Sequence, residues 1–243
     1  MGMYLISDIS DAIKLQSMMS KGGYNINLCN VHSMKLGIVA CDILKHEIES
    51  LVSDDPDFVQ KEYLEYSIHV FPEVMKEKIL EAVDKVKDNV DGILLGFAVC
   101  QSLENFTDEL DIPAVMLDGA DCIEVVLGPE EYEKEKKICP GTWFSTPGWA
   151  ENGKNGLIKE MHLDAMMDEG FPPEMFLDII FDAYSRCLYI DTGIGNNDYY
   201  VNLSEKFAQE LNFTHECRTG NTKNIEMAIT KLKKLFTDDS LEN

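Results

Sequence analysis

The sequence predicts an α/β fold, in which a parallel sheet or sheets are flanked by helices in Rossmann-like βα units, arranged as one lobe or two. Three observations favour this class. Short apolar runs alternate along the chain with amphipathic helical patterns. Three of these runs end at, or a few residues before, a cysteine. The chain has 243 residues and 45% hydrophobic content, which suffices for a sizeable core.

The first half of the chain reads as four βα units. Each predicted strand is short and apolar or β-branched, and each is followed by a helical pattern with one apolar face. Proline at position 72 is tolerated in the first turn of a helix. The predicted pairs of strand and helix are 36–40 with 42–51, 66–70 with 71–86, 93–97 with 102–110, and 113–117 with 121–127.

The second half begins with a charged helix, 130–137, which we interpret as a solvated face. An aromatic strand then leads into a tight Pro-Gly turn at Thr146 to Trp149, and a polar loop follows at 151–156. The remaining predicted elements are helices 163–170 and 173–184, strand 185–190, a glycine-rich turn at 191–198, helix 199–211, strand 213–217 and helix 224–236.

This order suggests three portions of chain. Residues 1–33 read as an N-terminal extension, and residues 34–156 as the βα domain that carries the cysteines at strand ends. Residues 157–243 read as a helical bridge plus a C-terminal βαβα portion, which could pack as one domain with the preceding part.

Composition limits the class of function. The formal net charge is −23, and such a surface repels nucleic acid and anionic membranes. The start of the chain lacks the pattern of a signal peptide, and no apolar run approaches the roughly 20 residues that span a bilayer. Seven cysteines in a chain of this length do not form a disulfide framework, so we expect a cytoplasmic protein with reduced thiols. The sequence leaves open whether the chain forms a homo-oligomer.

Cys41, Cys100 and Cys122 share one position, at or just after the end of a predicted strand. If the three strands are parallel neighbours, the thiols meet at one edge of one sheet, where open α/β sheets bind ligands. The sequence therefore predicts a three-cysteine metal site. We also expect the helix after each cysteine to lower the pKa of its thiol. The other cysteines lack this placement and read as core or incidental residues: Cys29 (beside His32), Cys139, Cys187 and Cys217.

Two kinds of metal suit three thiolates. A structural zinc is disfavoured because no C-x-x-C pair is present. A [4Fe–4S] cluster with one open iron fits and is our first hypothesis, as a redox or Lewis-acid centre. A catalytic zinc that takes a substrate thiol in its fourth position, for methyl transfer, is the alternative. A third reading is a metal-free module that binds a small ligand or a protein partner.

Further residues are candidates for contact with a cofactor or ligand. Asp121 could orient the site through a hydrogen bond. The turn at Thr146 to Trp149 could form a lid or wall, and the tryptophans at 143 and 149 could face a planar or apolar ligand. The glycine-rich turn that begins at Asp191 could present backbone N–H groups to an anion. The full set of candidates is Gly96, Asp121, Thr146, Gly148, Trp149 and Asp191.

Several segments together resemble a known family. They are Ile38-Val-Ala-Cys41, Gly92-Ile-Leu-Leu-Gly-Phe-Ala-Val-Cys100, Asp121-Cys122 with Leu127-Gly128, and Pro140-Gly-Thr-Trp-Phe-Ser-Thr-Pro-Gly-Trp149. The chain is similar, from Lys35 to its carboxyl end, to the archaeal and bacterial family designated domain of unknown function 1638. The resemblance implies methanogens and anaerobic bacteria as hosts, and genes near those of corrinoid-dependent methyltransferases. A corrinoid protein or methyltransferase is the partner it implies, and one-carbon metabolism the role.

The chain departs from the family pattern at two places. Family members carry His-Asp-Cys where this chain has Ala120-Asp121-Cys122. They often carry glycine and polar residues where this chain has Ala98-Val99-Cys100-Gln101. If that histidine acts as a ligand or acid–base group in relatives, this protein lacks it. The cysteines remain, which favours them as the essential set.

Overall fold

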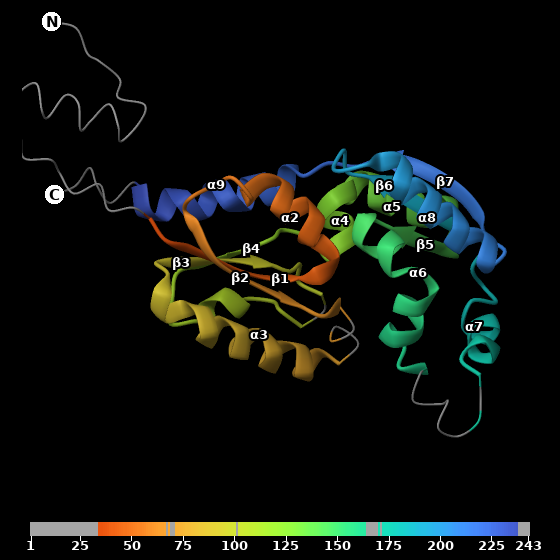
Figure 1. The fold of residues 1–243 in the computed structure, drawn as a ribbon, viewed down its shortest axis with the longest axis horizontal. Helices are drawn as coiled ribbons and strands as arrows, with labels where there is room; N and C mark the ends of the chain where they lie inside the picture. Colours follow the sequence, from red (N-terminus) through yellow and green to blue (C-terminus); the bar gives the residue numbers. More distant parts are fainter. Residues whose placement is uncertain are drawn as a thin grey trace, which may run out of the picture. The chain divides into compact units, whose positions relative to one another are not determined.

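Two sheets, each with parallel strands alone, form the framework of the described part of the chain (Figure 1). The computed structural model describes residues 34–66, 68, 71–100, 102–163, 170 and 172–237. By its contacts the chain divides into two units, residues 1–33 and 34–243, and the fold below is that of the second. The N-terminal extension predicted at 1–33, with Cys29 and His32, lies outside the described residues.

The first sheet has the strand order β2-β1-β3-β4. Because β1 lies between β2 and β3, the chain leaves β1 toward one side of the sheet and later returns to its other side. This reversal is a topological switch point, and α/β proteins bind ligands at the carboxyl edge of such points. The strands are β1 (Leu36–Cys41), β2 (Phe58–Leu64), β3 (Gly92–Gly96) and β4 (Ala114–Met116).

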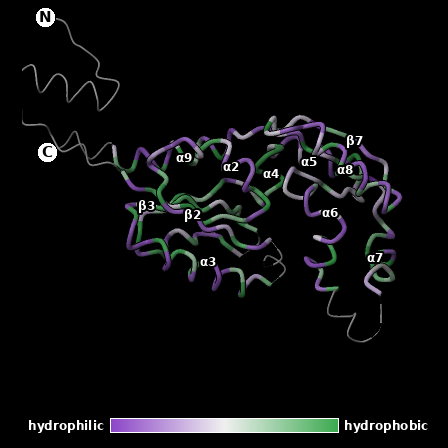
Figure 2. Tube along the Cα trace, in the orientation of Figure 1, coloured by the Kyte–Doolittle hydropathy of each residue, from purple (hydrophilic) through white to green (hydrophobic). Residues whose placement is uncertain are grey.

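Helices cover both faces of this sheet (Figure 1). Successive residues of a strand point to opposite faces, so the apolar run of β1 and β3 is buried on both sides. Ile38 and Leu94 pack with the helices of one face, whereas Val39 and Leu95 pack against the helix of the other. The first face carries α2 (Lys45–Val52), after the short 3-10 helix η2 (Asp42–Leu44), and α9 (Lys223–Thr237); the second carries α3 (Pro72–Val86), which continues into η4 (Lys87–Asn89). Figure 2 shows hydrophobic residues gathered on these strands, with mixed character along α3.

The second sheet has the order β5-β6-β7. Its strands are β5 (Thr142–Ser145), β6 (Arg186–Asp191) and β7 (Thr214–Thr219). Cys187 of β6 is fully buried among Leu157, Phe207 and Phe213, as expected for a core thiol. The helices around this sheet and between the sheets are α4 (Cys122–Leu127), α5 (Pro129–Ile138), α6 (Pro147–Glu160), α7 (Glu174–Ile180) and α8 (Asn197–Glu210).

The last helix joins the two sheets. α9 follows β7 of the second sheet, yet it packs on β3 and β4 of the first. Ile225 and Leu232 bury their side chains in the core there. Lys233 forms ion pairs with Asp55 (2.7 Å) and Asp57 (2.6 Å), in the turn before β2. The carboxyl-terminal helix predicted at 224–236 is thus confirmed as α9. The strands on which it packs, β3 and β4, lie far from it in the sequence.

The predicted fold class is confirmed, and several local predictions were wrong. The second strand is Phe58–Leu64, which was not predicted because this edge strand is partly exposed and carries polar residues that hide its period. Of the strand predicted at 66–70, Tyr66 and Ile68 lie in 3-10 turns, and the other three residues lie outside the described ranges. The helix predicted at 102–110 is only a 3-10 turn, η5 (Phe106–Glu109). The Pro-Gly turn and the polar loop at 151–156 are both parts of α6, where Pro147 opens the helix and Gly153 kinks it at φ +53°.

The charged helix 130–137 is present as α5, but it is not wholly solvated. Glu135 is fully buried and accepts hydrogen bonds from Arg186 (2.7 Å) and Arg218 (2.7 Å). The periodicity hid this role because charged residues surround Glu135 in the sequence. The boundary predicted after residue 156 falls inside α6, whereas the chain changes from one sheet to the other between β4 and β5. Among the described residues, no helix is both long and apolar enough to cross a membrane.

Candidate functional site

Cys41, Cys100 and Cys122 come together in the fold. Cys41 ends β1, Cys100 follows β3 by a short loop, and Cys122 begins α4 just after β4. The three strands are neighbours in one parallel sheet, which was the condition for their thiols to meet. All three cysteines line one small enclosed pocket of about 30 Å³, which we call the thiol pocket. Its other walls are Ile43, Leu44, Tyr66, Ile68, Met75, Gly96, Phe97, Ala98 and Trp149.

Burial keeps these thiols protonated. Loss of solvation raises the pKa of Cys41 to about 12 and that of Cys100 to about 11. The pKa of Cys122 rises well above its ordinary 9.0, first by burial and then by the charge of Cys41 and of Asp121. The expected lowering of these pKa values was therefore wrong in its net effect: at Cys41 the N–H of Ile43 in the helix that follows does lower the pKa, but burial raises it by more. No α-helix follows Cys100 within the described part of its loop, and around the other two thiols the apolar walls outweigh the dipole.

The donor set can be tested against the metals predicted from the sequence. Three cysteine sulfurs are soft donors, and their chemistry fits an iron–sulfur cluster or zinc. The pocket holds about the volume of one water molecule, however, and no group of three His, Cys, Asp or Glu side chains within the described ranges has the spacing of a metal site. The donors fit a thiophilic metal in kind, and binding would require the thiols to lose their protons and the walls of the pocket to move apart.

The loop that carries Cys100 is held in an unusual conformation. Cys100 has φ +43°, in the left-handed region that residues with a Cβ seldom occupy. Its N–H donates to the carbonyl of Ala120 (2.9 Å), and the N–H of Val99 donates to that of Gly119 (3.0 Å). These bonds tie the loop after β3 to the loop after β4. They fix Cys100 beside Cys122, and strain of this kind often accompanies a functional site.

Asp121 positions Cys122 through the helix that follows. Its Oδ1 accepts hydrogen bonds from the N–H groups of Ile123 (3.0 Å) and Glu124 (2.9 Å), which makes it the N-cap of α4. Its Oδ2 accepts from the hydroxyl of Tyr132 (2.5 Å) on α5. The carboxylate therefore fixes the start of α4, whose first residue is Cys122.

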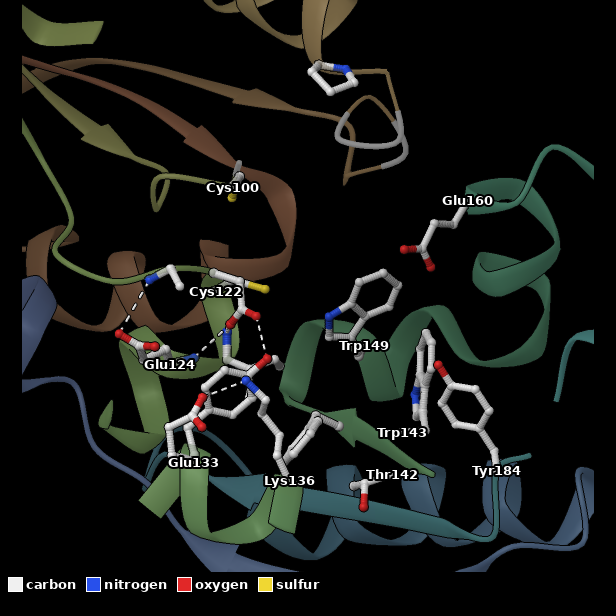
Figure 3. A pocket seen from close by; sticks show the side chains of 16 residues that line it. Cys100, Cys122, Glu124, Glu133, Lys136, Thr142, Trp143, Trp149, Glu160 and Tyr184 are labelled. Carbon is white, nitrogen blue, oxygen red and sulfur yellow. Dashed lines mark hydrogen bonds and ion pairs between the residues drawn. The ribbon is translucent and has the colours of Figure 1, made fainter. Parts of the chain in front are cut away.

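A larger cleft of about 730 Å³ adjoins the thiol pocket. Cys100, Cys122 and Trp149 line both spaces and so form the wall between them. Trp149 lowers the pKa of the Cys122 thiol against the larger rise from burial, and Figure 3 shows both side chains turned toward the space that Glu160 also faces. The cleft is lined mainly by aromatic and acidic side chains: Asp121, Glu124, Tyr132, Glu133, Trp143, Phe144, Trp149, Glu160 and Tyr184, with Lys136 as the basic member.

The other predicted site residues have different roles. Gly96 lines the thiol pocket and lets β1 and β3 pack closely, because a Cβ there would lie 2.4 Å from the Cβ of Ala40. Gly148 likewise lets α6 approach the Ile43 carbonyl, where a Cβ would lie 2.4 Å from the oxygen. Thr146 is the buried N-cap residue of α6.

Two predictions about this segment and the second sheet therefore change. The segment Thr146 to Trp149 is not a turn that could act as a lid, although Trp149 does form a wall. Asp191 ends β6 and accepts a hydrogen bond from the N–H of Gly193 (2.9 Å), so its carboxylate caps its own turn. It lines neither the thiol pocket nor the cleft.

Sequence reasoning missed part of the cleft. Tyr132, Glu160 and Tyr184 come from α5, the end of α6 and the turn before β6. None of them follows a strand of the first sheet, and each belongs to an ordinary helical or turn pattern. The sequence contains no local signal that joins them to the cysteines, because only the packing of the second sheet beside the first does so.

Comparisons with known proteins place the chain in a family. No curated protein and no solved structure matches the chain. The sequence model of the family described as "Protein of unknown function (DUF1638)" matches residues 63–229. This segment holds Cys100, Cys122 and the aromatic walls of the cleft, but it leaves out Cys41, so it is shorter than the resemblance that began at Lys35. Because the match covers well over half of the 243 residues, the chain belongs to this family.

Proposed function

We propose that the thiol pocket is a centre for a thiophilic metal, with Cys41, Cys100 and Cys122 as ligands and a [4Fe–4S] cluster as the first candidate. One observation carries the proposal: cysteines from three neighbouring strand ends line one pocket, and that pocket shares a wall with an open cleft. A three-cysteine cluster leaves one iron open and supplies Lewis-acid or redox chemistry when bound.

The residues of the chain supply the surroundings of such a centre. Asp121 holds the start of α4 and with it Cys122. Cys100, Cys122 and Trp149 line both the pocket and the cleft, so a ligand in the cleft would lie next to the centre at these residues. Apolar walls exclude water on the other sides, which strengthens electrostatic interactions within the pocket. The centre would then act on a ligand held in the cleft.

The biological role follows from the family resemblance and stays a proposal. It is a redox or Lewis-acid enzyme, or an accessory factor, in one-carbon and corrinoid methyl metabolism, with a corrinoid protein or methyltransferase as partner. A cytoplasmic location is part of the proposal, and the six cysteines of the described residues, all free thiols, support it.

The test is metal analysis of the full chain purified without oxygen. We expect about four irons and four acid-labile sulfides per chain, with a broad absorbance shoulder in the visible range. Cys41→Ala, Cys100→Ala and Cys122→Ala should each lose most of the metal. Cys187→Ala is the matched control, since it also removes a buried thiol, and it should retain the metal.

The other possible results of the metal analysis also decide between the hypotheses. Zinc without iron or sulfide, lost in the same three variants, would replace the cluster by the zinc-thiolate alternative for methyl transfer. No metal in protein prepared without oxygen, or equal metal in Cys122→Ala and in the unaltered protein, would overturn the metal centre. The three cysteines would then be packing residues of a metal-free binding module.

A further inference from the structure

We propose that the cleft beside the thiol pocket binds a small organic cation, of the quaternary ammonium or methylated amine class, against the faces of Trp143 and Trp149. This inference deepens the proposed function, on which it rests in one respect: the cleft is taken as the space where that centre meets its ligand. Three features of the cleft support such a ligand: its aromatic walls, the charges around them, and the contacts that already hold the one basic residue of the lining.

Aromatic rings form the floor of the cleft. The rings of Trp143 and Trp149 lie 5.3 Å apart at 76°, so that the two indoles make a corner. Tyr132 and Phe144 form a second edge-to-face pair at 5.2 Å. The face of an aromatic ring carries partial negative charge and attracts cations, and tryptophan does so most strongly. Two ring pairs in one cleft are a lining that favours a cation with an apolar surface.

The charges of the lining also favour a cation. Asp121, Glu124, Glu133 and Glu160 contribute carboxylates. Glu160 is only 8% exposed, so its field is weakly screened by water. In Figure 3 its carboxylate faces the same space as Trp149. The whole chain carries −23, which adds to the negative potential in the cleft.

Lys136 is the basic residue among those that line the cleft, and it is already engaged. Its ammonium pairs with Glu133 at 2.6 Å and lies 4.6 Å from the centre of the Tyr132 ring. The cleft thus shows one cation held between a carboxylate and an aromatic face. Trp149, next to Cys122, and Glu160 also bring an aromatic face and a carboxylate to one space in the cleft. A ligand cation would repeat there the contact that Lys136 makes at the rim.

Tryptophan fluorescence can be used to measure ligand binding in the cleft. Trp143 and Trp149 are the two tryptophans of the chain, and both line the cleft. Intrinsic tryptophan fluorescence therefore reports binding in the cleft without a label. The full chain is titrated with choline and, separately, with 3,3-dimethylbutan-1-ol, which has the same shape with carbon in place of the charged nitrogen. We expect saturable quenching or a spectral shift with choline, and binding at least about tenfold tighter than that of the neutral alcohol.

Two matched pairs of variants locate the site. Glu160→Gln removes the buried carboxylate and should weaken choline binding several-fold, while Glu151→Gln, on the same helix but outside the cleft, should not. Trp143→Leu removes one indole face and should weaken binding about tenfold by calorimetry. Phe181→Leu is its control, because Phe181 packs 5.8 Å from Trp143 without lining the cleft. Circular dichroism checks that each variant is folded.

Several results would overturn the inference. They are equal binding of choline and the neutral alcohol, no saturable response to either up to about 50 mM, or an equal loss in Glu151→Gln and Glu160→Gln. The result is separable from that of the metal analysis. Choline binding by protein that holds no metal keeps this inference and removes the proposed centre. Metal bound by the three cysteines, without choline binding, would keep the proposed centre and remove this inference.

Discussion

The hydroxyl of Thr192 donates a 3.1 Å hydrogen bond to Oε1 of Glu47 and so joins the end of β6 to α2, across the contact of the two sheets. Glu47 is fully buried, and its Oε2 has no hydrogen-bond partner among the described residues. Burial raises the pKa of this carboxyl from 4.5 to about 7, although the Thr192 bond and the nearby His46 oppose the rise. A carboxyl at the contact between the sheets therefore changes its protonation near neutral pH.

We predict that Glu47 makes the protein less stable as the pH rises from about 4.5 to about 7. Over this range the folded protein holds the Glu47 proton more tightly than the unfolded chain does, so the free energy of unfolding falls with increasing pH. The loss is on the order of 3 kcal/mol, from about 1.4 kcal/mol per pKa unit. Glu47→Gln lacks this titration, and urea unfolding between pH 5 and pH 8 measures the difference from the unaltered protein.

The difference between the stability curves of Glu47→Gln and the unaltered protein against pH removes the contribution of the other carboxylates, which both proteins share. Thr192→Val is a second variant, and it should move the midpoint of the loss to higher pH because the bond that favours the ionised form is gone. Parallel stability curves for Glu47→Gln and the unaltered protein would show that Glu47 does not titrate in this range.

The buried ion pair of Glu135 and Arg186 should be costly to break. The Arg186 side chain is 3% exposed, and Glu135→Gln leaves it with a neutral partner at 2.7 Å and a charged one, Glu216, only at 3.5 Å. We expect a loss of about 3–5 kcal/mol in the free energy of unfolding, the usual result when one partner of a buried pair is removed. Glu131→Gln on the same helix, where Lys134 pairs at 2.8 Å in solvent, should cost no more than about 0.5 kcal/mol. Equal costs in urea unfolding would contradict the buried network.

Glycine should be better tolerated at Cys100 than at Cys122. At φ +43° the Cβ of any other residue is strained, so metal-free Cys100→Gly should be about 1 kcal/mol more stable than Cys100→Ala. Cys122 begins a helix, where Cys122→Gly should instead be less stable than Cys122→Ala, by up to about 1 kcal/mol. Thermal unfolding of the four variants under reducing conditions measures the difference in stability between the Gly and the Ala variant at each position. Cys100→Gly that is no more stable than Cys100→Ala would contradict the left-handed conformation of Cys100.

Gly148 should not accept a side chain. A Cβ at this position would lie 2.4 Å from the backbone oxygen of Ile43, which cannot move aside as a flexible side chain can. Gly148→Ala should cost about 1–3 kcal/mol and shift the fluorescence of the adjacent Trp149. Gly37→Ala is a graded control, because its Cβ would meet the side chain of Val90 at 3.3 Å. Unchanged stability and fluorescence in Gly148→Ala would argue against this close approach of α6 to the first sheet.

Local patterns were sufficient for the framework. Apolar runs such as Leu36–Cys41 and Gly92–Gly96 are buried on both faces, and that property predicts parallel strands from the residues alone. The cysteines after those runs were therefore predicted to meet if their strands were neighbours, and the strand order of the first sheet meets that condition. Phe58–Leu64 was missed because an edge strand needs no such run.

By itself, the sequence determined the α/β class, the acidic surface and the place of Cys41, Cys100 and Cys122 at or just after strand ends, because each depends on composition or on short-range periodicity. The tertiary structure decided that those strands are neighbours, so that the three thiols meet. Only the tertiary structure decided that β5 pairs with β6 and not with β4, and that α9 returns to cover the first sheet. It also decided that Thr146 to Trp149 begins a helix, since Pro147 suits a turn and a first helical turn equally. The cleft joins Cys122 to Glu160 through packing between distant segments, and no local pattern encodes contacts of that range.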